Sequence, residues 1–225
     1  MALSKLAKKK SIIAHCIEMN ASGLNQGTSG NISIRHKDGM LITPTSLPYD
    51  QMTPKDIIYV AADGTPKGPH RPSSEWRFHR DILVARDDVN AIVHTHAMYS
   101  TILAILGKEI PPLHYMIAAA GGHNIRVAPY ALYGTQDLSN HVVAALRGRN
   151  ACLMDHHGMI AVGNTLESAM WLAVEVETLA RQYHGCLALG QEPPLLTREQ
   201  IQAVKKKIAN GAYGQAINQG NSSRP

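Results

Sequence analysis

The stretch Asn90-Ala-Ile-Val-His94-Thr-His96-Ala97 decides the fold and carries two candidate metal ligands. Its apolar residues predict a buried strand. Alternate side chains of a strand point to the same face, so His94 and His96 are expected to share one face with Ile92. Two imidazoles on one rigid strand can each offer a ring nitrogen to the same ion. A catalytic metal site then needs a third protein ligand and an open coordination position.

The segment Asp155-His156-His157-Gly158 is the expected source of that third ligand, because it is a polar stretch between two apolar runs. A His-x-His pair alone is more often structural or incidental than metal-binding. The second histidine cluster strengthens the metal interpretation, although its residues alone do not show which of its histidines is the ligand.

A candidate acid–base residue lies in Pro72-Ser73-Ser74-Glu75-Trp76, where a predicted helix begins that continues to Arg86. Ser73 or Ser74 is expected to cap this helix, with Glu75 in its first turn. The unpaired amides and the positive dipole end at such an N-terminus favour a phosphate. Glu75 either complements the helix dipole or, beside a metal, exchanges a proton at a carbon next to a carbonyl. The residues alone leave both interpretations open.

Two further loops are rich in glycine and hydroxyl residues. The first is Gly23-Leu-Asn-Gln-Gly27-Thr-Ser-Gly30-Asn31, and the second is Thr43-Pro44-Thr45-Ser46 at the end of a predicted strand. Glycines allow backbone amides to converge on an anion, so the first loop is either an anion-binding loop or a plain connector.

Composition indicates one globular α/β domain. The chain has 225 residues, of which 44% are hydrophobic and 17% are charged, and this length is enough to bury a substantial core. Its apolar runs are shorter than the ~20 residues that a membrane span needs, and its first residues lack the apolar core of a signal peptide. The odd number of widely spaced cysteines (Cys16, Cys152 and Cys186) predicts reduced core residues in a cytoplasmic protein.

The net charge of +5 raises the question of nucleic-acid binding. The lysines concentrate in two short runs, 8–10 and 205–207, in helical contexts and without interleaved aromatic residues. Solvated helix faces explain these runs better than a nucleic-acid interface. A mild positive field would still attract a phosphorylated substrate.

Periodicity and turn signals predict an alternation of helices and strands without an internal repeat. Capping boxes are expected at 164–167 and 197–200. Helices are expected over 4–22, 73–86, 98–106, 135–146, 164–189 and 197–210, and strands over 31–35, 40–43, 57–61, 90–97, 124–127, 151–154 and 159–162. The predicted domain spans residues 1–216, followed by a disordered tail over 217–225.

Six segments in collinear order, within residues 6–215, resemble the class II aldolase/adducin family, and most closely its L-fuculose-1-phosphate aldolases. The segments are Gly-Leu-Asn-Gln-Gly-Thr-Ser-Gly-Asn (23–31), Leu-Ile-Thr-Pro-Thr (41–45), Pro-Ser-Ser-Glu-Trp-Arg-Phe-His (72–79), Val-His-Thr-His-Ala (93–97), His-Tyr-Met-Ile-Ala-Ala-Ala-Gly-Gly (114–122) and His-His-Gly (156–158).

The resemblance implies a single-domain three-layer α/β/α sandwich around a largely antiparallel sheet. It also implies a cytoplasmic homotetramer with active sites between subunits, and no nucleic-acid or membrane partner. Zn²⁺, or another divalent cation such as Mn²⁺ or Co²⁺, would be bound by His94, His96 and His157. Glu75 would handle the proton, and Tyr115 would come from the neighbouring subunit to the aldehyde oxygen. The residues implied to bind the substrate phosphate are Gly30, Asn31, Thr45, Ser46, Ser73 and Ser74.

These residues suit a zinc-dependent aldehyde-lyase that reversibly cleaves a ketose 1-phosphate of the L-fuculose 1-phosphate type to dihydroxyacetone phosphate and an aldehyde. Cleaving a carbon–carbon bond beta to a carbonyl leaves an enediolate, and a Lewis-acidic cation stabilises that charge. Two departures leave the substrate open. Ser46 replaces a glycine of those aldolases, and their aromatic C-terminal end is matched only loosely, by Tyr213.

Other activities of the same superfamily compete with this interpretation. One is an aldolase acting on 5-deoxyribulose 1-phosphate or 5-methylthioribulose 1-phosphate. Another is a pentulose-5-phosphate 4-epimerase, in which the segment matching 73–75 usually ends in aspartate, so that Glu75 favours an aldolase. A sugar-acid phosphate decarboxylase is a further alternative. A non-catalytic adducin-like module is disfavoured, because those modules lose the metal ligands.

Overall fold

One mixed sheet organises the described part of the chain, which in the computed structural model is residues 3–212. Its strands follow the order β4-β3-β2-β1-β5-β8-β7-β6, and every neighbouring pair is antiparallel except β6 and β7. The strands are β1 (Asn31–His36), β2 (Gly39–Ile42), β3 (Ile58–Val60), β4 (Pro66–Lys67), β5 (Ala91–Thr95), β6 (Arg126–Ala128), β7 (Ala151–Met154) and β8 (Gly158–Gly163).

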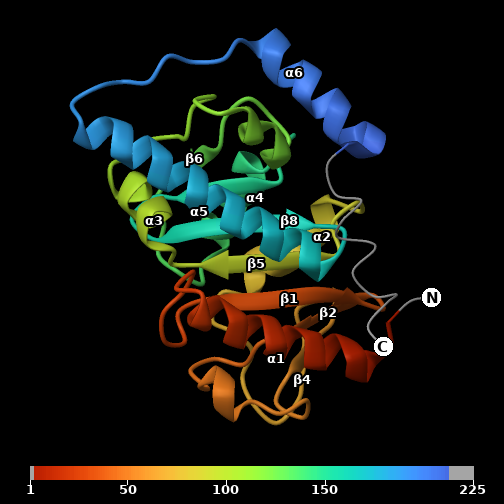
Figure 1. Cartoon of the computed structure of the whole chain (residues 1–225). Helices are drawn as coiled ribbons and strands as arrows, with labels where there is room; N and C mark the ends of the chain where they lie inside the picture. Colours follow the sequence, from red (N-terminus) through yellow and green to blue (C-terminus); the bar gives the residue numbers. More distant parts are fainter. Residues whose placement is uncertain (1–2, 213–225) are drawn as a thin grey trace, which may run out of the picture.

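Helices cover both faces of this sheet, which confirms the predicted three-layer sandwich (Figure 1). Helices α1, α3 and α5 pack on one face and α2 and α4 on the other, while α6 packs against η2. The helices are α1 (Lys5–Ala21), α2 (Trp76–Ala85), α3 (Met98–Ile105), α4 (Gln136–Ala145), α5 (Leu166–Ala188) and α6 (Arg198–Lys207), and the short turns are η1 (Tyr49–Gln51), η2 (Tyr115–Ala120) and η3 (Ile208–Ala212).

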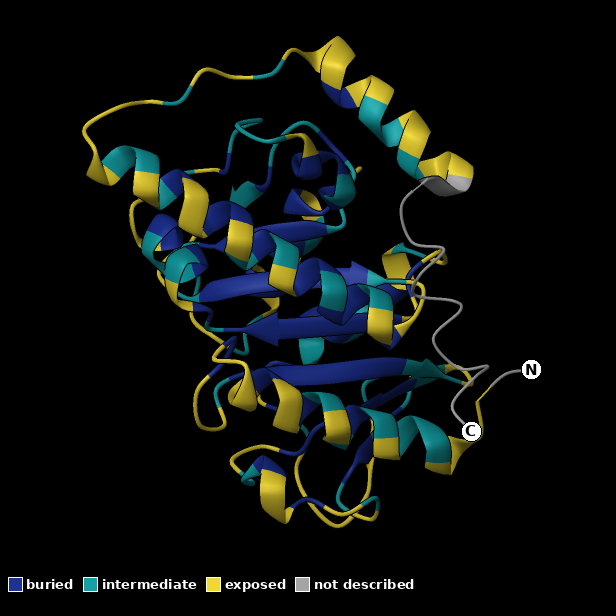
Figure 2. Ribbon diagram, viewed as in Figure 1, coloured by how far each residue is buried: buried dark blue, intermediate teal, exposed yellow. Residues whose placement is uncertain are grey.

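The central strand β5 is buried along its whole length, with β1 and β8 on its two sides (Figure 2). A strand covered by helices on both faces is expected to be apolar throughout rather than alternating. Val93 faces the core under α1, α3 and α5, whereas Ile92 faces the core under α2 and α4. By the same alternation His94 lies on the α2 side of the sheet. The polar imidazole ring of His94 is therefore held inside an apolar layer.

Threonine side chains cap three of the helices. Thr135, where a helix was predicted to begin, caps α4, and Thr197 forms the predicted capping box with Gln200 at the start of α6. The box expected at 164–167 is shifted by one residue, because Thr165 has the extended backbone of an N-cap and pairs with Ser168 instead.

Helix α2 begins later than the sequence predicted. Neither Ser73 nor Ser74 caps it; the N-cap position is occupied by Glu75, whose side chain makes no capping bond. The reason is a turn formed by the serines: the Ser73 hydroxyl accepts from the Glu75 amide, and the Ser73 carbonyl accepts from the Trp76 amide. The Glu75 carboxylate is consequently directed away from its own helix terminus.

Other features add detail that the sequence did not predict. The two-residue strand β4 and the turns η1 and η2 were not expected, and α6 ends at Lys207 rather than near 210. Cys16 and Cys152 are buried and Cys186 is partly buried, and all are free thiols, as predicted. Tyr213 and the tail predicted over 217–225 lie outside the described residues.

Within residues 3–212, every helix is too short or too polar to cross a membrane.

A substitution at Gly158 tests how tightly β8 packs against the end of β5. A Cβ at this position would collide with the Thr95 carbonyl and would lie 3.1 Å from a carbon of the His96 ring. We expect Gly158→Ala to lower the free energy of unfolding by about 1–3 kcal/mol, because backbone atoms must shift. The matched control is Gly185→Ala on the exposed face of α5, where nothing lies within 4 Å.

The control should raise the free energy of unfolding by about 0.5–1 kcal/mol, as alanine usually does in a helix interior. Urea unfolding monitored by circular dichroism measures both variants. Equal stability of the two variants would contradict the close packing at Gly158.

Candidate metal centre

Three histidines converge at the end of the central strand. His94 is in β5, His96 lies just beyond its end, and His157 is in the turn between β7 and β8. The pairing of β5 with β8 places this turn beside the end of β5. The ring centroids of each histidine pair are 5.0 Å apart, and one nitrogen from each ring lies within 4.8 Å of the others. The predicted convergence is therefore present.

One hydrogen bond of the His94 ring leaves its other nitrogen available to a cation. Its Nδ1 lies 2.9 Å from the Met159 carbonyl oxygen, which can only accept, so Nδ1 donates and, in the neutral ring, Nε2 carries the lone pair. A backbone carbonyl bonded to the second ring nitrogen is a common way to fix the tautomer of a metal-bound histidine. The Nε2 atoms of His94 and His96 are both buried without a hydrogen-bond partner. Buried polar atoms of this kind require an explanation, and a divalent cation provides one.

Glu75 faces the same point. Its Oε2 lies 3.1 Å from His94 Nε2, and its Oε1 lies 3.1 Å from His157 Nε2. A carboxylate oxygen and a lone-pair nitrogen are both acceptors, so this approach becomes favourable when a positive charge is shared between them. The imidazoles and the carboxylate together form a donor set that suits Zn²⁺.

Protonation states support the same arrangement. Burial raises the pKa of the Glu75 carboxyl, but His94 and His157 outweigh burial and hold the pKa well below its usual range. Burial and the neighbouring His94 and His157 lower the pKa of His96 to about 4. At neutral pH Glu75 is therefore a carboxylate and His96 is a neutral imidazole, which is the form that binds metals.

A cavity of about 310 Å³ opens beside these groups. All six residues that the family resemblance assigned to the phosphate line it together with Glu75, His96 and His157, whereas His94 is fully buried. The residues assigned to the phosphate are Gly30, Asn31, Thr45, Ser46, Ser73 and Ser74.

Backbone bonds join the loops around this cavity. The Ser73 amide donates to the Thr43 carbonyl and the Thr45 amide to the Arg71 carbonyl, so the second small-residue loop is tied to the start of α2. Gly30 packs closely against the backbone of β5: an added Cβ would lie 2.7 Å from the His94 carbonyl oxygen. Ser46 has a φ of 59°. It therefore has a left-handed conformation typical of glycine, although it carries a side chain.

Tyr115, the predicted partner of the aldehyde oxygen, is located elsewhere in this chain. It begins η2, is 39% exposed, and has its ring centroid 4.5 Å from that of His114. It is not among the described residues that line the cavity. A single chain thus brings Glu75 and the three histidines together but leaves Tyr115 apart from them.

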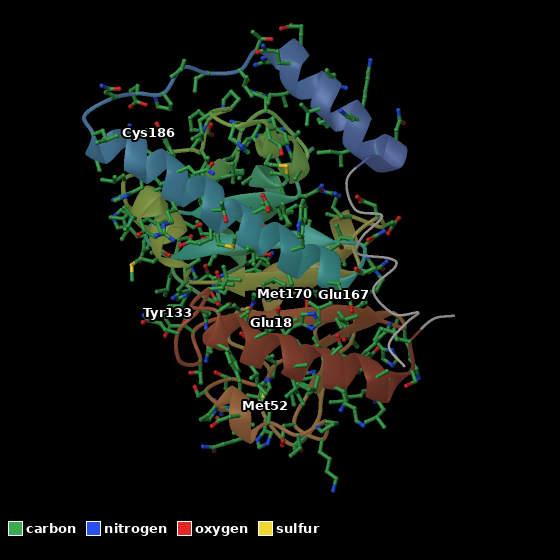
Figure 3. The ribbon with its side chains drawn as sticks, in the orientation of Figure 1. Glu18, Met52, Tyr133, Glu167, Met170 and Cys186 are labelled. Atoms are coloured by element: carbon green, nitrogen blue, oxygen red, sulfur yellow. The ribbon has the colours of Figure 1, made fainter. Side chains whose placement is uncertain are left out.

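Sequence reasoning missed four lining residues, which are Thr28, Ser29, Pro44 and Tyr133. Thr28 and Ser29 belong to the glycine-rich loop, whose composition could have indicated them. Tyr133 comes from the loop before α4 and lies beside the loop that precedes β1 (Figure 3). It is 64% exposed, and no local motif indicated its place at the cavity.

The adjacent residues His156 and His157 have different environments. His156 is exposed, has a φ of 53°, and its ring lies 2.6 Å from the Asp155 carboxylate. His157 turns inward toward the other two histidines. The structure thus resolves which histidine of this pair joins the cluster.

This difference gives a matched pair of variants. We expect His157→Ala to weaken metal binding by at least about 10–100-fold, which is the typical effect of removing an outer-shell partner of a metal ligand. His156→Asn should bind metal as the wild type does, because asparagine also tolerates the left-handed backbone. Equilibrium dialysis with elemental analysis measures both, and equal metal binding by the two variants would exclude His157 as a ligand.

Comparison with known proteins identifies the family. A family model described as the class II aldolase and adducin N-terminal domain matches residues 10–184. A 5-methylthioribulose-1-phosphate/5-deoxyribulose-1-phosphate aldolase of Rhodospirillum rubrum is 50% identical over 205 residues, covering 91% of this chain and 92% of that protein. An L-fuculose phosphate aldolase of Escherichia coli is 49% identical over 217 residues, covering 96% of this chain and 99% of that protein.

Comparison with solved structures identifies the same family. A solved structure of an L-fuculose 1-phosphate aldolase superposes with a TM-score of 0.88 at 36% identity, covering 93% of this chain and 98% of that one. The chain therefore belongs to the class II aldolase and adducin family, which confirms the resemblance that the six sequence segments indicated.

Proposed function

We propose that the protein is a zinc-dependent aldolase that reversibly cleaves a ketose 1-phosphate to dihydroxyacetone phosphate and an aldehyde. The observation that carries the proposal is a buried carboxylate, Glu75, held 3.1 Å from nitrogens of two clustered histidines at the wall of a polar cavity. This combination supplies an ionised base and a cation site at one point, which are the two elements that aldol chemistry needs.

The metal would be bound by His94, His96 and His157. Zn²⁺ suits three imidazole nitrogens, and Mn²⁺ or Co²⁺ are the alternatives. When bound, the cation supplies Lewis-acid stabilisation of the negative charge that develops on the substrate oxygens. The lone pair on His94 Nε2, which follows from the bond between Nδ1 and the Met159 carbonyl, supports its assignment as a ligand.

The substrate phosphate would be held by neutral groups. The described residues that line the cavity include neither lysine nor arginine. Hydroxyl groups of Thr45, Ser46, Ser73 and Ser74, together with groups of Gly30 and Asn31, would bind it, assisted by the positive end of the α2 dipole. Fixing the phosphate determines where the reacting carbons lie relative to Glu75.

Glu75 would exchange the proton at the carbon that bears the developing charge. In the cleavage direction the hydroxyl oxygen that becomes the aldehyde oxygen loses its proton, and the carbon–carbon bond breaks with its electron pair remaining on the dihydroxyacetone phosphate fragment. Glu75, once protonated, then delivers a proton to that carbon. In the synthetic direction the carboxylate removes the same proton. The lowered pKa of Glu75 keeps the carboxyl ionised, which is the form that can accept this proton.

A neighbouring subunit would complete the site. We propose a homotetramer in which Tyr115 of an adjacent copy reaches the aldehyde oxygen and donates to it or accepts from it. The exposure of Tyr115 and its absence from the described residues that line the cavity of its own chain support this assignment. Exposed apolar side chains beside the cavity, Tyr130, Leu132 and Tyr133, suit a contact between copies.

The substrate is proposed to be L-fuculose 1-phosphate or a close analogue. The second candidate is 5-deoxyribulose 1-phosphate or its 5-methylthio analogue, which the name of the Rhodospirillum rubrum relative favours. All of these share the ketose 1-phosphate unit and differ in the aldehyde portion. We further propose that the protein works in the cytoplasm without nucleic-acid or membrane partners, and that residues 1–216 form the functional domain.

Release of dihydroxyacetone phosphate tests the reaction type. We expect the metal-loaded protein to release it from a panel of ketose 1-phosphates, as read by a coupled reductase assay, and to lose this activity on chelation and regain it with Zn²⁺. The relative kcat/KM across the panel identifies the aldehyde portion. Conversion of a pentulose 5-phosphate without release would favour an epimerase, and carbon dioxide release from a sugar-acid phosphate would favour a decarboxylase.

Glu75→Gln tests the acid–base assignment. The amide keeps the shape of the side chain but cannot exchange the proton, so kcat should fall by about 10²–10⁴-fold while bound metal remains. The control is Glu18→Gln on the exposed face of α1, which should keep wild-type kcat. Steady-state kinetics with elemental analysis decides, and near-normal turnover of Glu75→Gln would remove Glu75 from the mechanism.

A further inference from the structure

Behind Glu75 lies a second polar layer, and the proposed mechanism gives no role to its two fully buried members, Ser33 and His79. Glu75 and His79 are four residues apart at the start of α2, so they lie on the same face of the helix. Asn31 and Ser33 are two residues apart in β1 and face this helix. A step of four residues along a helix covers ~6 Å, and a step of two residues along a strand covers ~6.7 Å. The spacing of the pair on α2 therefore matches that of the pair on β1.

A continuous chain of hydrogen bonds links the four side chains. Ser33 Oγ lies 2.7 Å from His79 Nδ1, and His79 Nε2 lies 2.5 Å from Asn31 Oδ1. Asn31 Nδ2 lies 2.9 Å from Glu75 Oε2. His79 and Ser33 are 0% exposed, Asn31 4% and Glu75 5%, so solvent does not compete for these bonds.

The Glu75 carboxylate determines the direction of each hydrogen bond that links these four side chains. An ionised carboxylate only accepts, so the Asn31 amide must present its NH₂ group to Glu75. Asn31 Oδ1 then accepts from His79, which must carry its proton on Nε2. His79 Nδ1 therefore accepts from the Ser33 hydroxyl. Burial and the nearby His94 lower the pKa of His79 to about 3, although Glu75 raises it, so the ring is neutral at pH 7 and has one tautomer.

We propose that His79 is a positioning residue for the catalytic carboxylate and acts through Asn31. Its Nε2–H bond holds the Asn31 amide in the orientation that donates to Glu75. A flipped amide would place Oδ1 against the carboxylate, where two acceptors repel, and would release Glu75 from its fixed place. This inference rests on the proposed function, because it assigns His79 a role only if Glu75 exchanges the substrate proton.

A purely structural histidine would behave differently. His79 stacks on Phe78 within the core under α2, so its removal is expected to lower stability whatever its role in catalysis. Stability alone therefore cannot decide. The informative readouts are rescue by a residue that keeps the donor, the separate effects on kcat and KM, and coupling to Asn31.

Two substitutions of similar size separate packing from hydrogen bonding. Gln at position 79 can donate to Asn31 and accept from Ser33, whereas Met fills similar space without these groups. In metal-saturated protein below its unfolding temperature, we expect His79→Met to lower kcat about 10–100-fold with KM and bound metal little changed. His79→Gln should stay within about threefold of wild-type kcat. In an Asn31→Ala background, His79→Met should cost less than about threefold, because the connecting amide is absent.

A measurement that does not depend on activity accompanies the kinetics. In protein labelled with ¹⁵N-histidine, the ring signals absent from His79→Gln belong to His79, and we expect them to show the Nε2–H tautomer at pH 7. If His79→Met does not fold, Ser33→Ala replaces it as the kinetic variant. Loss of the hydroxyl that selects the tautomer should lower kcat in the same direction, by less, without changing KM.

The outcomes separate the two proposals. Wild-type protein that releases no dihydroxyacetone phosphate from any ketose 1-phosphate would overturn the proposed function and this inference with it. With active wild type, the positioning role alone is overturned by an Nδ1–H tautomer, by equal losses in the Met and Gln variants, or by an undiminished loss in the Asn31→Ala background. Unchanged kcat in Ser33→Ala would overturn it if that variant is the one measured.

Discussion

The antiparallel pairing of β5 with β1 on one side and β8 on the other is the constraint on which the site depends. The register places Asn31 opposite His94 and Thr95 opposite Met159. The turn before β8 therefore delivers His157 to the cluster, and β1 delivers the amide that contacts Glu75. A one-residue slip would turn each of these side chains to the opposite face. The buried apolar residues of β5 exclude such a slip. They therefore also fix the positions of the side chains at the candidate site.

Keeping charged and polar groups inside an apolar layer is costly unless each has a partner. Ser33, His79, Asn31 and Glu75 satisfy one another in a single arrangement of donors and acceptors. The buried atoms left without a hydrogen-bond partner at this point, Oε1 of Glu75 and Nε2 of His94 and of His96, meet at the candidate metal centre. The layer is thus satisfied on its inner side and could accept a cation at the cavity, so that a rigid scaffold can hold the Glu75 carboxylate in its ionised form.

Local sequence signals predicted the features that depend on neighbouring residues. The strand that carries His94, the hairpin of β1 and β2, and the threonine caps of α4 and α6 follow from periodicity and capping chemistry. Features that depend on tertiary contacts were not predicted. The bond from His79 to Asn31 spans 48 residues, Tyr133 reaches the cavity from a distant loop, and the serine turn that delays α2 depends on a bond to Thr43. The choice of His157 over His156 came from family resemblance, since the two residues have identical side chains.

X-ray absorption spectroscopy of the protein loaded with one equivalent of Zn²⁺ tests the central claim most directly, because it reports the atoms around the ion without relying on turnover. Three imidazole nitrogens at about 2.0–2.1 Å, with the remaining coordination made by oxygen, is the result that we expect. A sulfur ligand at about 2.3 Å, or fewer than three imidazoles, would contradict a centre formed by His94, His96 and His157.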